Sequence, residues 1–352
     1  MVEQTFERIL KEQTVKYSRM KPQDYGKLAF QNEFGAKHLA LDRETVIANL
    51  LKEMEHLDLD STPLQMESIA ENLCRFPLAF CKDRAAICLL ADLFIKTAQN
   101  SAGTREGLLQ KIACLAEYQI EGMQEWLADW ENKGYPAVHH SEIYRQCYHP
   151  HYRLLQKDYA VYFPALLEIE KLAQAGRPVW IGIDGRCGSG KTHFAGLAGS
   201  LCSCNVIHMD DFYLPVEKRP QNWEEIPGGN MDFERLRSEV LLPIQEGRQA
   251  VYRPYRCEQG EIAEERKLPY SHITILEGSY SHHPKLFSEY DLKIFLDCGA
   301  KEQEHRLRER EGGYYSAFAK KWIPMEERYL EHFKIREGCD QYLNTSSLFK
   351  IK

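Results

Sequence analysis

The chain of 352 residues lacks several features that mark whole classes of protein. No run of about 18 apolar residues occurs, so we expect no membrane-spanning helix. The first 20 residues are charged throughout and contain no apolar core, so no secretory signal peptide is expected. The 11 cysteines are scattered and form no C-x-x-C pair, which excludes a zinc ribbon and disfavours a disulfide framework. These absences favour the reducing cytoplasm as the compartment.

An excess of positive charge is also missing. The net charge is −7, with 17 basic and 22 acidic residues in positions 1–150 and 28 and 30 in positions 151–352. Neither half has the basic footprint of a nucleic-acid-binding domain, so we expect no nucleic-acid partner. What is present is ordinary globular composition, with 43% hydrophobic and 28% charged residues. The length predicts about two domains.

The first part of the chain has a helical pattern and hardly any alternation with a period of two. Apolar residues recur at steps of three and four within Ile47–Leu57, Leu89–Phe94 and Leu108–Leu115. Thr104 is expected to cap the helix that follows it, with Glu106 in the first turn where the helix dipole favours negative charge. We therefore predict an all-α domain over residues 1–175.

The pattern changes at Pro178. Short apolar, β-branched runs have the length of buried parallel strands, at Val179–Ile183, Asn205–Met209, His272–Leu276 and Leu292–Leu296. Helical stretches at 192–201 and 233–242 lie between them. Strand and helix alternation predicts an α/β domain with a parallel sheet over residues 176–352.

A phosphate-binding loop lies between the first of these strands and the helix after it. Residues 185–192 fit the pattern G-x-x-x-x-G-K-[ST], and the flanking strand and helix are the context that this pattern requires. Its glycines allow a tight turn that directs backbone N–H groups at phosphate oxygens. The predicted nucleotide-binding residues are Gly185, Arg186, Cys187, Gly188, Ser189, Gly190, Lys191 and Thr192. Lys191 would reach the β- and γ-phosphates, and the Thr192 hydroxyl would bind Mg²⁺.

Acidic residues follow two of the other predicted strands. Asp210 and Asp211 come after the strand at 205–209, and Glu277 comes after the strand at 272–276. The carboxyl ends of parallel strands meet at one edge of the sheet, so these acids should converge on the phosphate loop. Glu277 suits a role in holding Mg²⁺, and Asp210 or Asp211 suits a general base that takes a hydroxyl proton.

Arginines are expected to cover the phosphates. Arg306 and Arg310 are four residues apart after the last predicted strand and share a helix face, whereas Arg308 points elsewhere. Such a mobile arginine-bearing lid is a requirement of small-molecule kinases. The N-K-x-D sequence that GTPases use to read guanine is absent.

Together these motifs resemble the uridine kinase and phosphoribulokinase family of P-loop kinases. The resemblance covers residues 179–340 and depends on six pieces in order: the phosphate loop, Asp210–Tyr213, Asn230–Asp232, Tyr252–Tyr255, Leu276–Gly278 and Asp291–Asp297. It implies ATP and Mg²⁺ as cofactors and a small-molecule hydroxyl as the phosphoryl acceptor.

The resemblance also implies residue roles. The catalytic base falls on Asp210, the Mg²⁺ partner on Glu277 and the lid on Arg306 and Arg310. Substrate binding falls on Tyr213, Asp232, Tyr255 and Arg256, of which Asp232 would bind ribose hydroxyls and Tyr255 would border a base. Arg256 departs from the family, which has an aspartate there, and its positive charge indicates an acidic or already phosphorylated acceptor. The acceptor therefore stays open between nucleoside and sugar-like compounds.

Two matters stay open. A P-loop ATPase switch, with the helical domain as a partner-binding module, is the alternative function, and the helical domain could also shape the acceptor pocket, regulate or form a homo-oligomer. The segment His139–Arg153 is rich in histidine, tyrosine and arginine. Its spacing fits no known zinc pattern, so we expect a polar structural cluster, with a second ligand site as an alternative.

Overall fold

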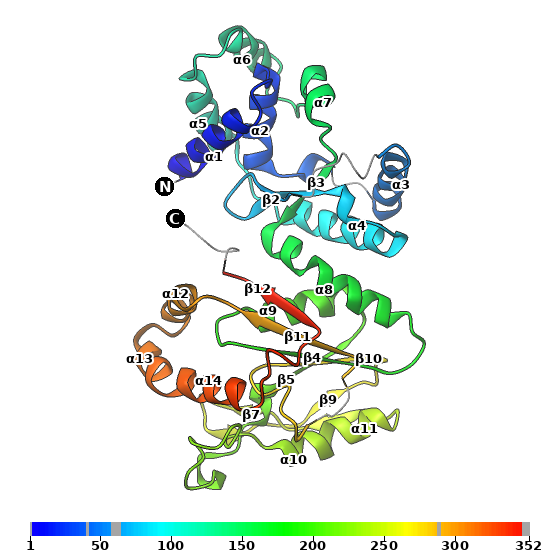
Figure 1. Cartoon of the computed structure of the whole chain (residues 1–352), viewed down its shortest axis with the longest axis vertical. Helices are drawn as coiled ribbons and strands as arrows, with labels where there is room; N and C mark the ends of the chain where they lie inside the picture. The colour runs from blue at the N-terminus through cyan, green and yellow to red at the C-terminus, as the bar shows by residue number, and fades with distance from the viewer. Residues whose placement is uncertain (1, 40–41, 58–64, 287–289, 347–352) are drawn as a thin grey trace. The chain divides into compact units, whose positions relative to one another are not determined.

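The computed structural model describes residues 2–39, 42–57, 65–286 and 290–346. The described chain forms two compact units, the first through Phe163 and the second from Pro164 onward (Figure 1). The division falls within one helix, α8 (Lys157–Ala173), at its internal proline. The sequence placed the domain boundary after residue 175, and that boundary stays a prediction.

The first unit is rich in helices, as its apolar periodicity predicted. Its helices are α1 (Val2–Lys16), α2 (Pro22–Phe34), α3 (Arg43–Met54), α4 (Arg84–Gln99), α5 (Arg105–Ala116), α6 (Met123–Asn132) and α7 (Glu142–Tyr148). The cap of α5 is confirmed, because the Thr104 hydroxyl accepts a hydrogen bond from the Gly107 N–H at 3.0 Å. Leu50, Leu90 and Leu115 on the predicted apolar faces are fully buried.

This unit also contains a small antiparallel sheet, which is an addition to the all-helical prediction. Its strands lie in the order β1 (Glu67–Ser68), β2 (Leu73–Pro77), β3 (Tyr152–Gln156). The central strand β2 is buried along its whole length, including Arg75. A strand buried on both faces does not alternate between apolar and polar residues, which is why its sequence gave no period-two signal.

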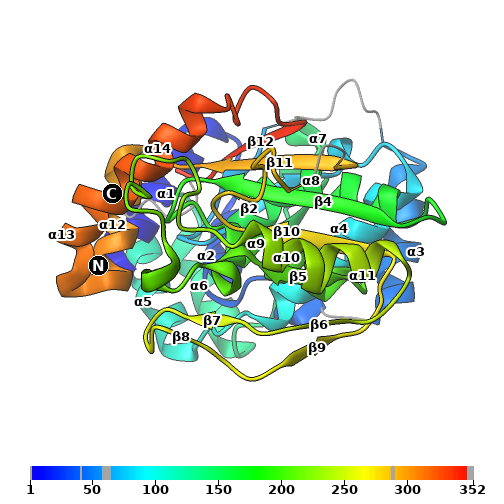
Figure 2. The same cartoon turned by 90° about the horizontal axis from the view of Figure 1, so that it is seen from below.

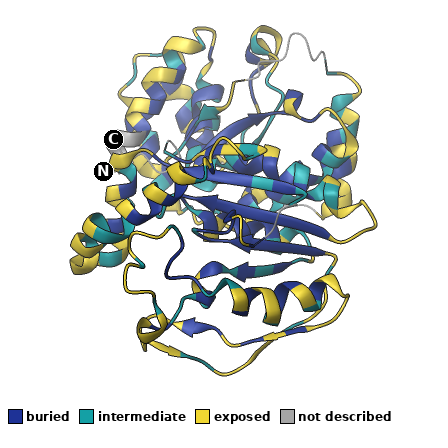
Figure 3. Ribbon diagram, turned by 60° about the horizontal axis from the view of Figure 1, so that its bottom comes forward, coloured by how far each residue is buried: buried dark blue, intermediate teal, exposed yellow. Residues whose placement is uncertain are grey.

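The second unit is built on a five-stranded parallel sheet. The strand order is β12-β11-β4-β10-β5 (Figure 2). The strands are β4 (Val179–Gly185), β5 (Asn205–His208), β10 (Ile273–Glu277), β11 (Leu292–Asp297) and β12 (Gln341–Asn344). The four predicted strands are confirmed, and β12 at the edge is additional. The central strands β4 and β10 are buried throughout, as Figure 3 shows.

Helices cover both faces of this sheet (Figure 1). On one face α9 (Lys191–Leu201) packs against β4, β5 and β10. On the other face, apolar side chains of α10 (Phe233–Leu236), α11 (Leu242–Gln245) and α14 (Ile323–His332) join a core with Trp180, Ile207 and Phe295 of the strands. A π-helical turn over Arg237–Leu241 links α10 to α11. The predicted α/β architecture is therefore present in the second unit.

Short elements complete the second unit. Two hairpin pairs are formed by β6 (Ala250–Tyr252) with β9 (Arg266–Leu268) and by β7 (Tyr255–Arg256) with β8 (Glu261–Ile262). The last helices before α14 are α12 (Ala300–Glu311) and α13 (Tyr315–Ala317). In the described parts of both units, no helix combines the length and the apolar character needed to cross a bilayer.

Candidate active site

The phosphate loop adopts a conformation that only its glycines allow. Gly185 ends β4 with φ 139°, and a Cβ there would lie 1.9 Å from the Leu296 carbonyl oxygen of the neighbouring strand β11. Gly190 has φ 95° and precedes the first residue of α9. The loop therefore turns directly from the sheet edge into the N-terminus of a helix.

Several groups of this loop fit a phosphate. The first N–H groups of α9 have no carbonyl partner within the helix, and the helix dipole adds positive potential at the same place. Lys191 is buried, and its ammonium donates to the carbonyl oxygens of Gly185 at 2.6 Å and Arg186 at 3.0 Å. Within the described structure the buried Ser189 hydroxyl has no hydrogen-bond partner. An unsatisfied buried hydroxyl next to the N-terminus of α9 supports the predicted nucleotide site.

Thr192 and Glu277 lie together, as the sequence predicted from their positions. The Thr192 hydroxyl donates to the Glu277 carboxylate at 3.2 Å, which joins the start of α9 to the end of β10. His208, at the end of β5, places Nδ1 2.5 Å from the same carboxylate. This hydrogen bond raises the pKa of His208, although burial opposes the effect. A hydroxyl and a carboxylate at a phosphate loop are the oxygen ligands that Mg²⁺ takes from proteins, so these two residues fit the ion.

The structure separates the two neighbouring aspartates, which the spacing alone left equivalent. Asp211 accepts hydrogen bonds from Tyr252 and Arg266, both at 3.0 Å, and so ties the β6–β9 hairpin to the turn after β5. Asp210 is exposed and accepts a hydrogen bond from the Tyr213 hydroxyl at 2.9 Å. Asp210 is therefore the more accessible of the two aspartates.

The surroundings of Asp210 raise the pKa of its carboxyl. Partial desolvation by the surrounding chain raises the pKa of its carboxyl even though part of the residue is accessible, and the negative charge of Glu277 raises it further. The Tyr213 hydrogen bond and the positive charge of Lys191 oppose this rise. Because β10 runs parallel to both β4 and β5, the carboxyl ends of these strands, where Glu277, the phosphate loop and Asp210 lie, are at the same edge of the sheet.

The predicted substrate residues lie on segments next to Asp210. The N–H of Asp232 donates to the Phe212 carbonyl at 2.8 Å, and Tyr213 and Met231 form an isolated antiparallel β-bridge. The Asp232 carboxylate caps α10 and also accepts a hydrogen bond from Arg235, so both its oxygens are engaged.

The β7 strand, which carries Tyr255 and Arg256, contacts the turn at Met209–Phe212. Tyr255 is buried and Arg256 is exposed. Burial raises the pKa of Cys257, directly after β7, and the negative charge of Asp210 raises it further. This segment therefore lies beside the expected base.

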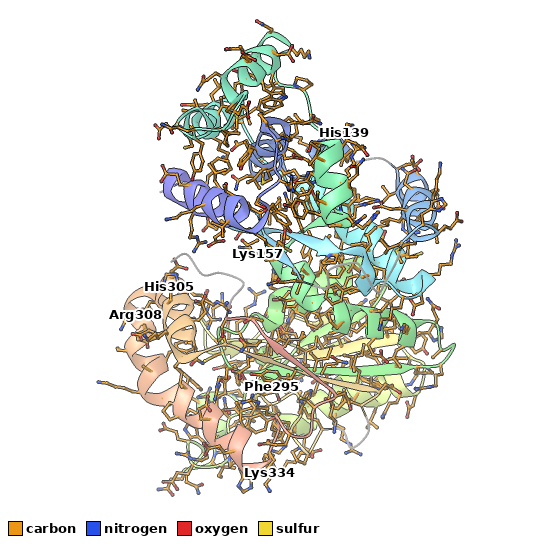
Figure 4. The ribbon with its side chains drawn as sticks, turned by 45° about the horizontal axis from the view of Figure 1, so that its top comes forward. His139, Lys157, Phe295, His305, Arg308 and Lys334 are labelled. Atoms are coloured by element: carbon orange, nitrogen blue, oxygen red, sulfur yellow. The ribbon has the colours of Figure 1, made fainter. Side chains whose placement is uncertain are left out.

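The three arginines of α12 differ in their surroundings. Arg306 donates to the Gly188 carbonyl at 2.9 Å and to the Thr345 carbonyl at 2.7 Å, and thereby braces the phosphate loop. Arg308 is exposed and pairs with Glu304, away from the loop (Figure 4). Arg310 is exposed, donates from Nε to the Glu311 carboxylate at 2.5 Å and lies 5.6 Å from the centre of the Phe318 ring, so its role over the phosphates stays a prediction.

Sequence reasoning missed the acids of α14. The Glu326 carboxylate is buried and accepts hydrogen bonds from the Cys187 N–H at 2.8 Å and from the Ser279 hydroxyl at 2.5 Å. The Glu327 carboxylate accepts hydrogen bonds from Nε and one Nη of Arg186. The other Nη of Arg186 donates to Asp297. Nothing in the local pattern indicated these contacts, because they join residues 47 to 141 positions apart in the chain.

No cluster of three or more His, Cys, Asp or Glu side chains arranged to hold a metal ion occurs among the described residues, the histidine-rich segment 139–153 included. Thr192 and Glu277 thus contribute only part of a coordination shell. Mg²⁺ in phosphoryl-transfer enzymes keeps several waters and uses one or two carboxylates together with substrate phosphates. The Thr192 hydroxyl and the Glu277 carboxylate are compatible with this coordination.

No protein-family model matches the chain. One solved structure similar to it is described as a possible uridine kinase from Bacillus stearothermophilus. It is 21% identical with a TM-score of 0.40 over 50% of this chain and 96% of that chain. A second, described as a possible kinase of a fructose transport system from Silicibacter sp. TM1040, is 18% identical. Its TM-score is also 0.40, over 51% of this chain and 97% of that chain. The chain thus resembles uridine kinase-like structures over about half of its length.

Proposed function

We propose that the chain is an ATP- and Mg²⁺-dependent kinase that transfers the γ-phosphoryl group to a hydroxyl of a small molecule. The observation that carries this proposal is the convergence of three segments at one sheet edge. The phosphate loop, the Thr192–Glu277 pair and the accessible Asp210 carboxylate come from the ends of β4, β10 and β5. Phosphoryl transfer to a hydroxyl needs an anion cradle, a cation site and a proton acceptor together.

The proposed reaction assigns one task to each group. Asp210 takes the proton of the acceptor hydroxyl, whose oxygen attacks the γ-phosphorus while the bond to the bridging oxygen breaks and ADP leaves. Lys191 and Arg310 counter the negative charge that spreads over the phosphoryl oxygens. Thr192 and Glu277 would hold Mg²⁺, which would neutralise charge on the β- and γ-phosphates. The contacts of Arg306 with the loop support a role in keeping the cradle in shape.

The acceptor is proposed to be a nucleoside or sugar-like compound that carries a negative group. Arg256 is exposed on β7, and this strand contacts the turn at Met209–Phe212 that carries Asp210. The Arg256 cation therefore lies on a segment beside the expected base. An acceptor with a carboxylate or phosphate group would complement it.

The test is a panel of hydroxyl compounds screened for acceptor-dependent ADP release. Neutral and phosphorylated sugars and nucleosides would be compared, with the Asp210→Asn protein as the blank. We expect at least one acceptor to raise ADP release in the wild type and kcat to fall by about 10²- to 10⁴-fold in Asp210→Asn. The Asp211→Asn protein is the matched control, because its side chain holds the β6–β9 hairpin, and it should keep most of the activity.

Equal acceptor-dependent rates in the wild type and Asp210→Asn would remove Asp210 from its proposed role. ADP release that no acceptor raises and that Asp210→Asn leaves unchanged would instead favour an ATPase switch. The melting temperature of each variant, compared with that of the wild type, distinguishes a loss of activity from a loss of folding.

A further inference from the structure

The first unit contains a pocket that the proposed kinase chemistry does not use. It has a volume of about 310 Å³ and is lined by Lys27, Arg145 and the histidines His139, His140, His149 and His151. Lys27 lies on α2, and the others come from the segment around α7, where Figure 4 marks His139. This size lies at the lower end of the range for small-molecule sites.

The pocket has more positive than negative charge. Glu53 is its single acidic lining residue within the described chain. The Glu53 carboxylate is already hydrogen-bonded to His151 Nδ1 at 2.9 Å and to an Nη of Arg153 at 2.7 Å. Neither Lys27 nor Arg145 is in an ion pair with any carboxylate that the structure describes. The Lys27 ammonium donates only to a carbonyl oxygen, that of Val138, at 3.2 Å. Among the described residues, these two cations of the pocket thus have no carboxylate paired with them.

The surroundings of Lys27 support this conclusion. Burial lowers the pKa of Lys27 to about 8, and the nearby guanidinium groups of Arg75 and Arg145 lower it further against the opposing charge of Asp24. Asp24 is itself fully engaged by the N–H and hydroxyl of Ser141 and by His140. Lys27 is half-buried and Arg145 is exposed, so solvent reduces the repulsion between them, and a bound anion would attract both.

His140 differs from Lys27 and Arg145 because its ring is uncharged and both its nitrogens are hydrogen-bonded. Burial lowers the pKa of His140 to about 4, so its ring is neutral near pH 7. Its two ring nitrogens lie 3.1 Å from Asp24 Oδ1 and 2.8 Å from the Tyr152 hydroxyl. His140 therefore fixes the wall of the pocket, and the groups left for a ligand are Lys27, Arg145, His139 and His149.

An aromatic pocket adjoins the charged one. It is lined by Tyr17, Tyr144 and Tyr148 together with Arg75, and it shares His149, Pro150 and His151 with the charged pocket. Arg75 is buried, and one of its Nη atoms pairs with Glu67, which also lines this pocket, at 3.3 Å, whereas its Nε has no hydrogen-bond partner in the described structure. A ligand with an anionic head and an organic body would match cations on one side and tyrosine rings on the other.

We propose that this pocket binds the phosphate group of a small phosphorylated molecule. A phosphate offers the acceptor oxygens and the charge that Lys27 and Arg145 lack, and the histidines at its rim donate further hydrogen bonds. The tyrosines face the organic part of the ligand. This site lies entirely within residues 17–152 and is independent of the phosphate loop, so it stands whether or not the proposed kinase activity does.

The test is isothermal titration calorimetry with three probes: inorganic phosphate, glucose 6-phosphate and AMP. The full-length Lys191→Ala protein is used, so that binding at the phosphate loop is weakened. We expect at least one probe to bind, and Lys27→Met or Arg145→Gln added to this background to weaken it about tenfold or more, as loss of a charge-assisted hydrogen bond does. Lys133→Met, which removes an exposed cation directly after α6 in the same unit, should leave the affinity unchanged.

A second measurement does not depend on the variants folding normally. Diethyl pyrocarbonate modifies accessible histidines, and mass spectrometry reports each position. The bound probe should slow modification of His139 and His149 and leave His305 on α12 unaffected. The probe that binds with the highest affinity shows whether the ligand is free phosphate or a phosphate ester. Equal affinity in the Lys27→Met, Arg145→Gln and Lys133→Met proteins, or modification of His139 and His149 at the same rate with and without probe, would overturn the proposal.

Discussion

At the scale of single residues, the phosphate loop is held by a carboxylate from a distant helix. Glu326 is buried, and burial raises the pKa of its carboxyl while the charge of Lys191 opposes the rise. It accepts hydrogen bonds from the Cys187 N–H and the Ser279 hydroxyl. A buried acceptor that satisfies two donors is costly to remove, because both donors are then left unpaired.

Glu326→Ala should therefore lower the free energy of unfolding by about 2–4 kcal/mol and weaken ATP binding, since the loop loses its support. Glu326→Gln keeps an acceptor oxygen and should cost less. Urea unfolding followed by fluorescence measures the first effect, and calorimetric titration with ATP measures the second. Glu331→Ala, at an exposed carboxylate of the same helix, should change stability by less than about 0.5 kcal/mol. Equal urea midpoints for Glu326→Ala and Glu331→Ala would contradict this role.

At the scale of elements, the site depends on how closely β4 and β11 approach where the loop begins. Gly185 lies at this point with φ 139°, and Gly196 lies within α9, 11 positions later, with open space around its α-carbon. The two glycines belong to the same strand–loop–helix unit but meet opposite steric conditions. They form a matched pair for testing whether loop geometry or chain flexibility matters.

Gly185→Ala should displace the loop, because its Cβ would meet the Leu296 carbonyl and its φ is unfavourable for a residue with a side chain. We expect loss of ATP binding and a lower melting temperature. Gly196→Ala should instead stabilise the chain by up to about 1 kcal/mol, since alanine is a better helix former. Differential scanning fluorimetry with and without ATP distinguishes the two. ATP affinity retained by Gly185→Ala would show that the loop tolerates a side chain there.

At the scale of the whole molecule, each unit buries a histidine that resists protonation. Burial lowers the pKa of His140 in the first unit and of His283 in the second to about 4. In the unfolded chain these rings titrate near pH 6.5. Between pH 6.5 and 4 the unfolded state therefore binds more protons than the folded state, so stability is full above pH 6.5 and falls as the pH decreases through this range.

The free energy of unfolding should accordingly decrease between pH 7.5 and pH 5, by an amount on the order of 2 kcal/mol for each histidine. Urea unfolding at several pH values measures it. His140→Gln and His283→Gln should each flatten the dependence, whereas His305→Gln, at an exposed position of α12, should not. A free energy of unfolding that stays constant from pH 7.5 to pH 5 would argue against both buried rings.

The sequence determined the features that short stretches of chain encode. A glycine-rich turn between a β-branched run and a helix is fixed by local backbone geometry, so the phosphate loop and four strands of the parallel sheet could be predicted. Because parallel strands align their carboxyl ends, the proximity of Asp210 and Glu277 to Lys191 could be predicted as well. The cap at Thr104 depends on only a few neighbouring residues and was equally accessible.

Tertiary structure alone decided what each side chain at these positions contacts. The spacing of Asp210 and Asp211 leaves them equivalent, although the family resemblance favoured Asp210, and the packing of the β6–β9 hairpin engages Asp211 and leaves Asp210 accessible. Glu326 and the charged pocket around Lys27 arise from residues that are far apart in the chain. Burial and hydrogen bonding are set by which distant segments pack together, and a local pattern of residues carries no information about that packing.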